Sequence, residues 1–179
     1  FAGDRAREFG LRIQGWTYQQ LAERGMGIQT TVKATRAAGL DDIVALSLAR
    51  LDRMLLSGTT TVEAKSGYGL NLEDEAKQLE ALRRLGALHP VDVVPTFMGA
   101  HEIAPEYRDK REGYIRLLVE AIIPEVGRRG LAEFFDIFCE PGVFSIAETR
   151  QLIEAAKAAG FKIKVHADEF VSQGGAELA

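Results

Sequence analysis

Hydrophobic and polar positions along residues 58–179 follow two alternating periodicities. Four short segments are rich in β-branched and aromatic residues, which is typical of strands, and the stretches between them repeat apolar residues every three to four positions, which is typical of helices. The expected strands are 59–65, 91–97, 133–139 and 162–167. The pattern therefore predicts a strand–helix repeat.

Start and stop signals support the three helices between these strands. Asn71 is the expected N-cap of the first helix and Gly86 its terminator. Pro124 should kink or shorten the second helix. Ser145 and Glu148 have capping-box spacing at the start of the third helix.

The expected strands begin at intervals that match βαβ units, which take about 30 residues or more. Such units make parallel strands, and nearly continuous apolar strands predict that both faces of the sheet are covered. Two architectures fit: an open doubly wound sheet, or part of a (β/α)8 TIM barrel. No GxGxxG follows a strand, which disfavours the dinucleotide-binding form of the first. A complete barrel needs about 250 residues, so 179 residues would hold only part of one.

The first part of the chain has a different pattern. Residues 18–25 and 41–58 have helical character, and no clear strand precedes residue 59. We therefore expect one partial catalytic barrel domain over 1–179, in which a helical segment, 1–57, leads into the strand–helix repeats of 58–179.

Composition and charge narrow the function classes. Hydrophobic residues make up 46% of the chain and charged residues 27%, as in ordinary globular proteins. The net charge of −4 provides no basic field for nucleic acid or an anionic membrane. The single cysteine, Cys139, excludes an intrachain disulfide, and we expect it to be a small buried apolar residue. With no long apolar run and a charged first segment, the sequence predicts a cytoplasmic protein.

Candidate chemistry gathers where the expected strands end, the edge at which parallel barrels carry their active sites. Tyr68, His101 and Glu169 follow expected strands, and His166 lies near the end of one, whereas His89 lies at the opposite edge. Each side chain has a structural alternative: a histidine at a strand end is usually a hydrogen-bonded surface residue, and a carboxylate there often pairs with a helix N-terminus. Their convergence favours an active site.

These residue types suit hydrolysis of an amide-like bond. A neutral imidazole can bind a divalent metal, a nearby carboxylate can act as base on water activated by that metal, and a second histidine can polarise a carbonyl. Zinc takes at least three protein ligands, however, and the spacings HxH, HExxH and CxxC are absent. From the residues alone, the site is either independent of metal or incomplete. Glu63 and Lys65, on the first strand, are expected to pair with each other.

Several segments of the chain carry a resemblance to a known family. FAGDRAREF, TVEAKSGYGL, TFMGAHEIAPEY, FFDIFCEPGVFS and KVHADEF resemble, in order, the imidazolonepropionase family of the amidohydrolase superfamily, and the likeness covers essentially the whole chain. The resemblance implies a metal-containing (β/α)8 barrel, of which this chain would hold the second to fifth strands. It implies hydrolytic opening of the ring of 4-imidazolone-5-propanoate to N-formimidoyl-L-glutamate in histidine degradation, by a homodimeric enzyme.

The resemblance also implies roles for individual residues. His166 would be a ligand of one divalent metal ion, zinc or iron. Glu169 would be the acid and base acting on the attacking water and the ring nitrogen, and His101 would contact the ring carbonyl. Arg5 would bind the propanoate of the substrate as a bidentate fork. Further substrate contacts would come from Tyr18 and Tyr68.

The chain also departs from the family pattern. The HxH metal pair of the family, its later histidine and its metal-binding aspartate are not in this sequence. We therefore expect a piece of a longer chain with an incomplete metal site and no activity alone. Two alternatives stay open: another cyclic amidohydrolase or deaminase, and a non-catalytic α/β module that binds a small anion. Asp168 is expected to be structural.

Overall fold

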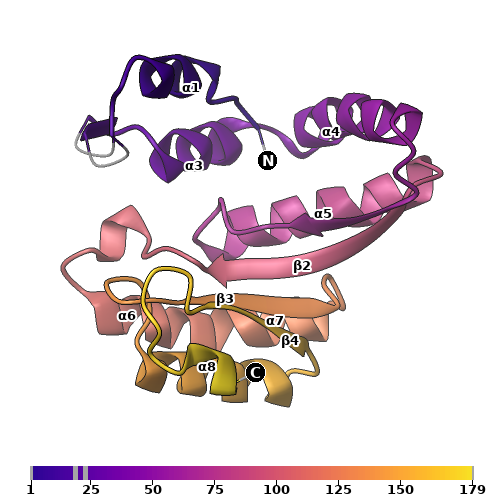
Figure 1. The fold of residues 1–179 in the computed structure, drawn as a ribbon. Helices are drawn as coiled ribbons and strands as arrows, with labels where there is room; N and C mark the ends of the chain where they lie inside the picture. The colour runs from indigo at the N-terminus through magenta and orange to yellow at the C-terminus, as the bar shows by residue number, and fades with distance from the viewer. Residues whose placement is uncertain (1, 18–19, 22–23, 179) are drawn as a thin grey trace.

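The computed structural model describes residues 2–17, 20–21 and 24–178, and its centre is one parallel sheet (Figure 1). The strands are β1 (Thr61–Lys65), β2 (Asp92–Ala100), β3 (Phe134–Cys139) and β4 (Lys162–Ala167). They lie in the order β1-β2-β3-β4, and every neighbouring pair is parallel. The four strands expected from the hydrophobic pattern are thus confirmed, and their carboxyl ends share one edge.

Helical segments precede the sheet and connect its strands. The longer helices among the described residues are α1 (Ala6–Ile13), α3 (Ile28–Ala37), α4 (Leu40–Leu56), α5 (Leu72–Leu88), α6 (Arg111–Leu117), α7 (Ile123–Arg128) and α8 (Ile146–Ala158). A π-helical turn, η2 (Leu118–Ile122), joins α6 to α7, and short 3-10 turns are η1 (Pro105–Tyr107) and η3 (Gly175–Leu178). None of the helices so described is long and apolar enough to cross a membrane.

The helix boundaries confirm most of the sequence signals. The Asn71 side chain accepts a hydrogen bond from the Asp74 amide at 2.8 Å, and Ser145 with Glu148 forms the expected capping box. The expectation that Gly86 ends α5 is wrong. The helix continues to Leu88, because the amide of residue 89 still donates to the Leu85 carbonyl at 3.0 Å.

The interruption expected at Pro124 is confirmed. The α-helical pattern of α6 changes to the π-helical turn η2 directly before α7, which carries Pro124 at its second position. A proline has no amide hydrogen to donate to the preceding turn, and a wider turn is one way in which a helix accommodates such a missing bond.

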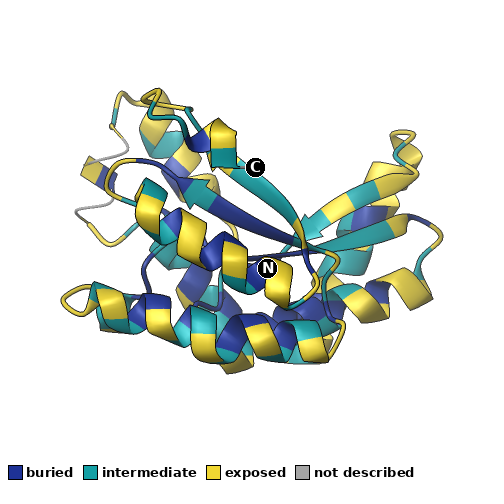
Figure 2. Ribbon diagram, turned by 90° about the horizontal axis from the view of Figure 1, so that it is seen from below, coloured by how far each residue is buried: buried dark blue, intermediate teal, exposed yellow. Residues whose placement is uncertain are grey.

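One face of the sheet packs against the connecting helices. Phe97, Phe135 and Ile137 are fully buried in one apolar core, together with side chains from α5, the α6–α7 segment and α8. Figure 2 shows these helices with their buried stripe turned inward and their exposed stripe outward. Because the crossover helices cover the same face, the arrangement is that of a partial TIM barrel and not of a doubly wound sheet.

The opposite face is largely polar, and most of its side chains are partly or fully exposed, so within the described residues the expected cover is found on one face of the sheet only. Strand side chains alternate between faces, and most positions on this face are polar or charged, although Phe134 and Phe138 lie on it too. The register places Lys65 beside Thr96, and Asp136 beside Lys164. The polar residues that define this polar face are Glu63, Lys65, Thr96, Asp136, Lys164 and His166.

The N-terminal part is helical where it is described, as expected. Helix α4 packs on α5 through Ile43 and Leu51, in a second apolar cluster with Leu85. Helix α3 reaches the carboxyl edge of the sheet, since Arg36 Nε donates to the Gly69 carbonyl at 2.6 Å. The expected helical stretch 18–25 falls partly outside the described residues.

Candidate active site

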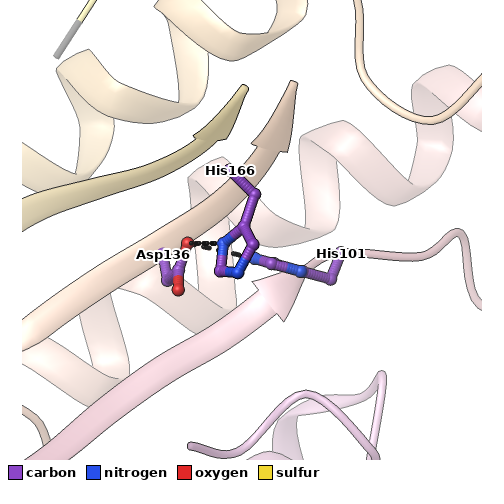
Figure 3. A group of neighbouring side chains, drawn as sticks. All are labelled: His101, Asp136 and His166. Carbon is purple, nitrogen blue, oxygen red and sulfur yellow. Dashed lines mark hydrogen bonds and ion pairs between the residues drawn. The ribbon is translucent and has the colours of Figure 1, made fainter. Parts of the chain in front are cut away.

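A buried aspartate joins the two histidines at the carboxyl edge of the sheet. Asp136 lies within β3 with no exposed side-chain surface, and its Oδ1 is 2.8 Å from His166 Nδ1 and 3.1 Å from His101 Nε2. The two rings meet edge to face with their centroids 4.6 Å apart. Figure 3 shows both histidines pointing toward this carboxylate. The expected convergence of His101 and His166 is therefore confirmed, and His89 lies at the opposite edge, after α5.

A lysine neutralises the other side of the same carboxylate. Lys65 Nζ donates to Asp136 Oδ2 at 2.5 Å and lies 3.3 Å from Glu63 Oε1, which confirms the expected Glu63–Lys65 pair. Glu63 also accepts hydrogen bonds from Thr96 at 2.6 Å and from Lys164 at 2.7 Å. Hydrogen bonds and ion pairs therefore connect Lys164, Glu63, Lys65 and Asp136 across the polar face to the two histidines.

The electrostatics of this group fix two protonation states. Burial alone would raise the pKa of Asp136, but the hydrogen bonds from His101 and Lys65 outweigh it and hold the pKa well below its ordinary range. Burial lowers the pKa of His101 despite the bond to Asp136. At neutral pH Asp136 is therefore a carboxylate and His101 a neutral imidazole, whose Nε2–H donates a hydrogen bond to Asp136.

The same group is suited to hold a metal ion. One ligand atom from each of His101, Asp136 and His166 lies within 4.8 Å of the other two. Imidazole nitrogen and carboxylate oxygen are donors that zinc and iron accept. His166 presents Nδ1 to Asp136, which leaves its Nε2 as the available donor, and its side chain is 45% exposed. A divalent ion therefore fits the donor types on this face.

The loop after β1 holds Tyr68 in a tight turn. Gly67 has φ +96°, and a Cβ at this position would lie 2.6 Å from the Met98 carbonyl oxygen. The glycine is required both for its backbone angle and for this close approach. Burial raises the pKa of the half-buried Tyr68, so its phenol stays protonated at neutral pH.

The candidate substrate cation is Arg5. The Arg5 charge acts on Tyr68 and opposes the rise in its pKa. Arg5 precedes α1 and pairs with the buried Glu8 at 2.6 Å. Tyr18, the other expected substrate contact, lies outside the described residues.

The structure does not bring the Glu169 carboxylate into the histidine group. Glu169 follows β4, its side chain is exposed, and its amide donates to Glu140 Oε1 at 2.6 Å. Asp168 has a structural role, as expected: its φ is +55°, and its carboxylate accepts the amides of Gln173 at 2.7 Å and Ala176 at 3.1 Å.

Asp136 is the central residue that the sequence pattern did not single out. A signal was present, because this aspartate interrupts the apolar run FFDIFC of β3. An ionised side chain inside a buried strand is costly unless it is paired, so it usually marks a partner or a site. Alternation also places it on the face of His166, since Phe138, two residues later, pairs in register with His166. Cys139 is buried, as expected.

Comparison with known proteins finds imidazolonepropionases that are similar to this chain. The imidazolonepropionase of Symbiobacterium thermophilum is 61% identical over 180 residues, and that of Geobacillus thermodenitrificans is 56% identical over 179. Each alignment covers 100% of the chain. The chain is homologous to the imidazolonepropionases over its whole length. The Treponema denticola imidazolonepropionase is similar at 50% identity over 177 residues.

The match covers a minor part of each relative. The chain spans about 42% of the length of these imidazolonepropionases. No family model matches the chain. The segments that carry the site, from β1 to the turn after β4, all fall within the aligned region.

Proposed function

We propose that the protein containing this chain hydrolyses 4-imidazolone-5-propanoate to N-formimidoyl-L-glutamate, a step in histidine degradation. The observation that carries the proposal is the pair of histidines on one buried aspartate at the carboxyl edge of the sheet, in a chain homologous to imidazolonepropionases. Residues 1–179 would be one part of a single catalytic barrel domain. Cytoplasmic location, a homodimer, and the absence of nucleic-acid and membrane partners belong to the same proposal.

His166 would hold one divalent ion, zinc or iron, through Nε2. A bound ion would lower the pKa of water toward about 7 and polarise a carbonyl oxygen. Asp136 supports this role, because a carboxylate that accepts the Nδ1 proton fixes both the tautomer and the orientation of the ring. His166 would be one member of the ligand set, and the HxH pair that the resemblance implies as further ligands is absent from this sequence.

His101 is proposed to contact the ring carbonyl of the substrate. Its Nε2 faces Asp136, so only Nδ1 is available to the substrate. In the neutral ring Nδ1 is an acceptor, so it would donate a hydrogen bond to the carbonyl oxygen only after taking up a proton from solvent or substrate. The adjacent ionised Asp136 would stabilise the resulting imidazolium as charge develops on the substrate oxygen.

Glu169 is proposed as the acid and base for the water and the ring nitrogen. Its side chain is exposed, and its amide is fixed by Glu140, which presents the carboxylate at the surface of the turn after β4. Arg5 and Tyr68 would bind the propanoate and orient the ring, and Tyr18 would add a further contact. A guanidinium and a protonated phenol are both hydrogen-bond donors suited to a carboxylate.

The decisive test is turnover by the full-length protein. Loss of 4-imidazolone-5-propanoate, followed by its absorbance, is expected with the parent enzyme, whereas guanine should not be consumed. E169Q should keep substrate binding and lose turnover, because the amide cannot transfer the proton. Binding without turnover in the parent would favour the anion-binding module, and consumption of guanine would favour a deaminase.

A further inference from the structure

Four acidic side chains are buried in the described part of the chain: Glu8, Glu75, Asp136 and Glu140, with exposures of 5%, 0%, 0% and 1%. Asp136 holds the two histidines. We propose that the three glutamates are positioning residues, each fixing the main chain or side chain of one further site residue: Arg5, Tyr68 or Glu169. This inference rests on the proposed function, because it assigns the glutamates to substrate and proton-transfer residues of that reaction.

Glu75 anchors the loop of Tyr68 from the first turn of α5. Its Oε2 accepts the Gly67 amide at 2.9 Å, and its Oε1 accepts the Gly69 amide at 2.9 Å and the Leu70 amide at 2.8 Å. These amides flank Tyr68 on both sides, so the loop wraps around the carboxylate. Both oxygens are used, and three main-chain donors would lose their acceptor if the carboxylate were removed.

Glu140 anchors the turn that carries Glu169. Its Oε1 accepts the Glu169 amide at 2.6 Å and the Phe170 amide at 3.3 Å. Its Oε2 is buried and has no hydrogen-bond partner within the described residues. Glu140 therefore acts on the turn through one oxygen only, which distinguishes it from Glu75.

Glu8 fixes Arg5 and connects it to the start of α3. Its Oε2 accepts Arg5 Nε at 2.7 Å, while its Oε1 accepts the Gly27 amide at 3.0 Å and the Thr30 hydroxyl at 2.9 Å. Burial would raise the pKa of Glu8, but the bonds from Arg5 and Gly27 outweigh it and lower the pKa. Arg5 is thus held by an ionised partner at neutral pH.

The physical argument is the cost of burying charge. An ionised carboxylate is strongly destabilised away from water unless hydrogen bonds replace its hydration. Loops at the edge of a sheet lack the regular bonds of strands and helices, so their amides need other acceptors. A buried carboxylate can satisfy several amides of one irregular loop at once and so fix its conformation. Here each such loop or helix start presents a candidate site residue.

The test compares variants of the full-length enzyme by KM, kcat and thermal midpoint. E75Q should raise KM about tenfold with little change in kcat, because its single carbonyl oxygen cannot serve three amides and Tyr68 is displaced. E140A should lower kcat about tenfold at unchanged KM, because Glu169 loses its fixed turn. E140Q should restore kcat to near the parent value, because its amide oxygen can take the place of Oε1.

Glu148 provides the matched control. It also accepts a main-chain amide, that of Ser145 at 2.8 Å, and pairs with Arg111, but it caps α8 in the outer helix layer. E148Q should lower the thermal midpoint and leave both KM and kcat unchanged. This separates a loss of stability from a loss of positioning.

The proposal would be overturned in either of two ways. Equal effects of E140A and E140Q on kcat would mean that buried charge, and not the Oε1 contact, matters. An unchanged KM in folded E75Q would mean that the position of Tyr68 does not depend on Glu75. If E75Q does not fold, the comparison of E140A with E140Q alone tests the proposal. A parent enzyme without turnover would instead refute the proposed function, and the positioning roles with it.

Discussion

The replacement D136N tests the proposed centre of the site most directly. The fully buried Asp136 accepts hydrogen bonds from two histidine nitrogens on Oδ1 and from the Lys65 ammonium on Oδ2. Asparagine has nearly the same shape but offers one acceptor oxygen and one amide donor. The variant therefore changes the hydrogen-bonding pattern with little change in packing volume.

The expected effect on metal affinity depends on whether the amide oxygen of the new asparagine bonds to Lys65 or to the histidines. A charged donor makes the stronger bond, so the amide oxygen should stay with Lys65 and the NH2 group should face the histidines. His166 Nδ1 must then accept a hydrogen bond, which places the proton on Nε2 and blocks that nitrogen as a metal ligand. Loss of such a carboxylate partner typically lowers metal affinity about 10- to 100-fold.

The stability of the protein should fall as well. Removing one partner of a buried ion pair costs about 3–5 kcal/mol of unfolding free energy. This cost is reduced here, because Lys65 keeps Glu63 at 3.3 Å as a partner and is 27% exposed. We therefore expect D136N to lower the unfolding free energy of the metal-free protein by about 2–4 kcal/mol.

Metal affinity of the full-length protein can be measured by competition with a chelator, and stability by denaturant unfolding of the metal-free form. The matched control is D92N, at the exposed start of β2, which should change neither quantity. Unchanged metal affinity in D136N, within about threefold, would refute the role of Asp136 in fixing the tautomer of His166.

Two further substitutions test the surroundings of the site. G67A should lower the unfolding free energy by about 1 kcal/mol for the positive φ alone. It should also displace the loop, since the new Cβ would lie 2.6 Å from the Met98 carbonyl oxygen. The displaced Tyr68 should raise KM, and an unchanged KM would contradict this. Hydrogen bonds from Arg111 lower the pKa of Glu148 from its ordinary 4.5 to about 2. The resulting stabilisation is complete above pH 4.5 and is lost as the pH falls toward 2, so the difference in thermal midpoint between parent and E148Q should shrink over that interval; a constant difference would contradict the assignment.

Periodicity and end signals determined the repeat of this fold. Alternation and β-branched content located all four strands, and capping chemistry at Asn71 and Ser145 located two helix starts, because these are local properties of neighbouring residues. Parallel strands have their carboxyl ends at one edge, so strand assignment alone brought His101 and His166 together. The resemblance to imidazolonepropionases was likewise contained in the order of the motifs and is supported by the comparisons.

Only the tertiary structure decided what holds these residues in place. Asp136 is distant in sequence from both histidines and from Lys65, and their meeting depends on the register between strands. Glu75 is an ordinary acidic residue in the first turn of a helix until the loop around Tyr68 closes over it. Sequence patterns report which face a residue takes, whereas the acceptor that a buried amide or imidazole finds depends on packing between segments. The carboxylates that support the site therefore became visible only once the strands and loops were assembled.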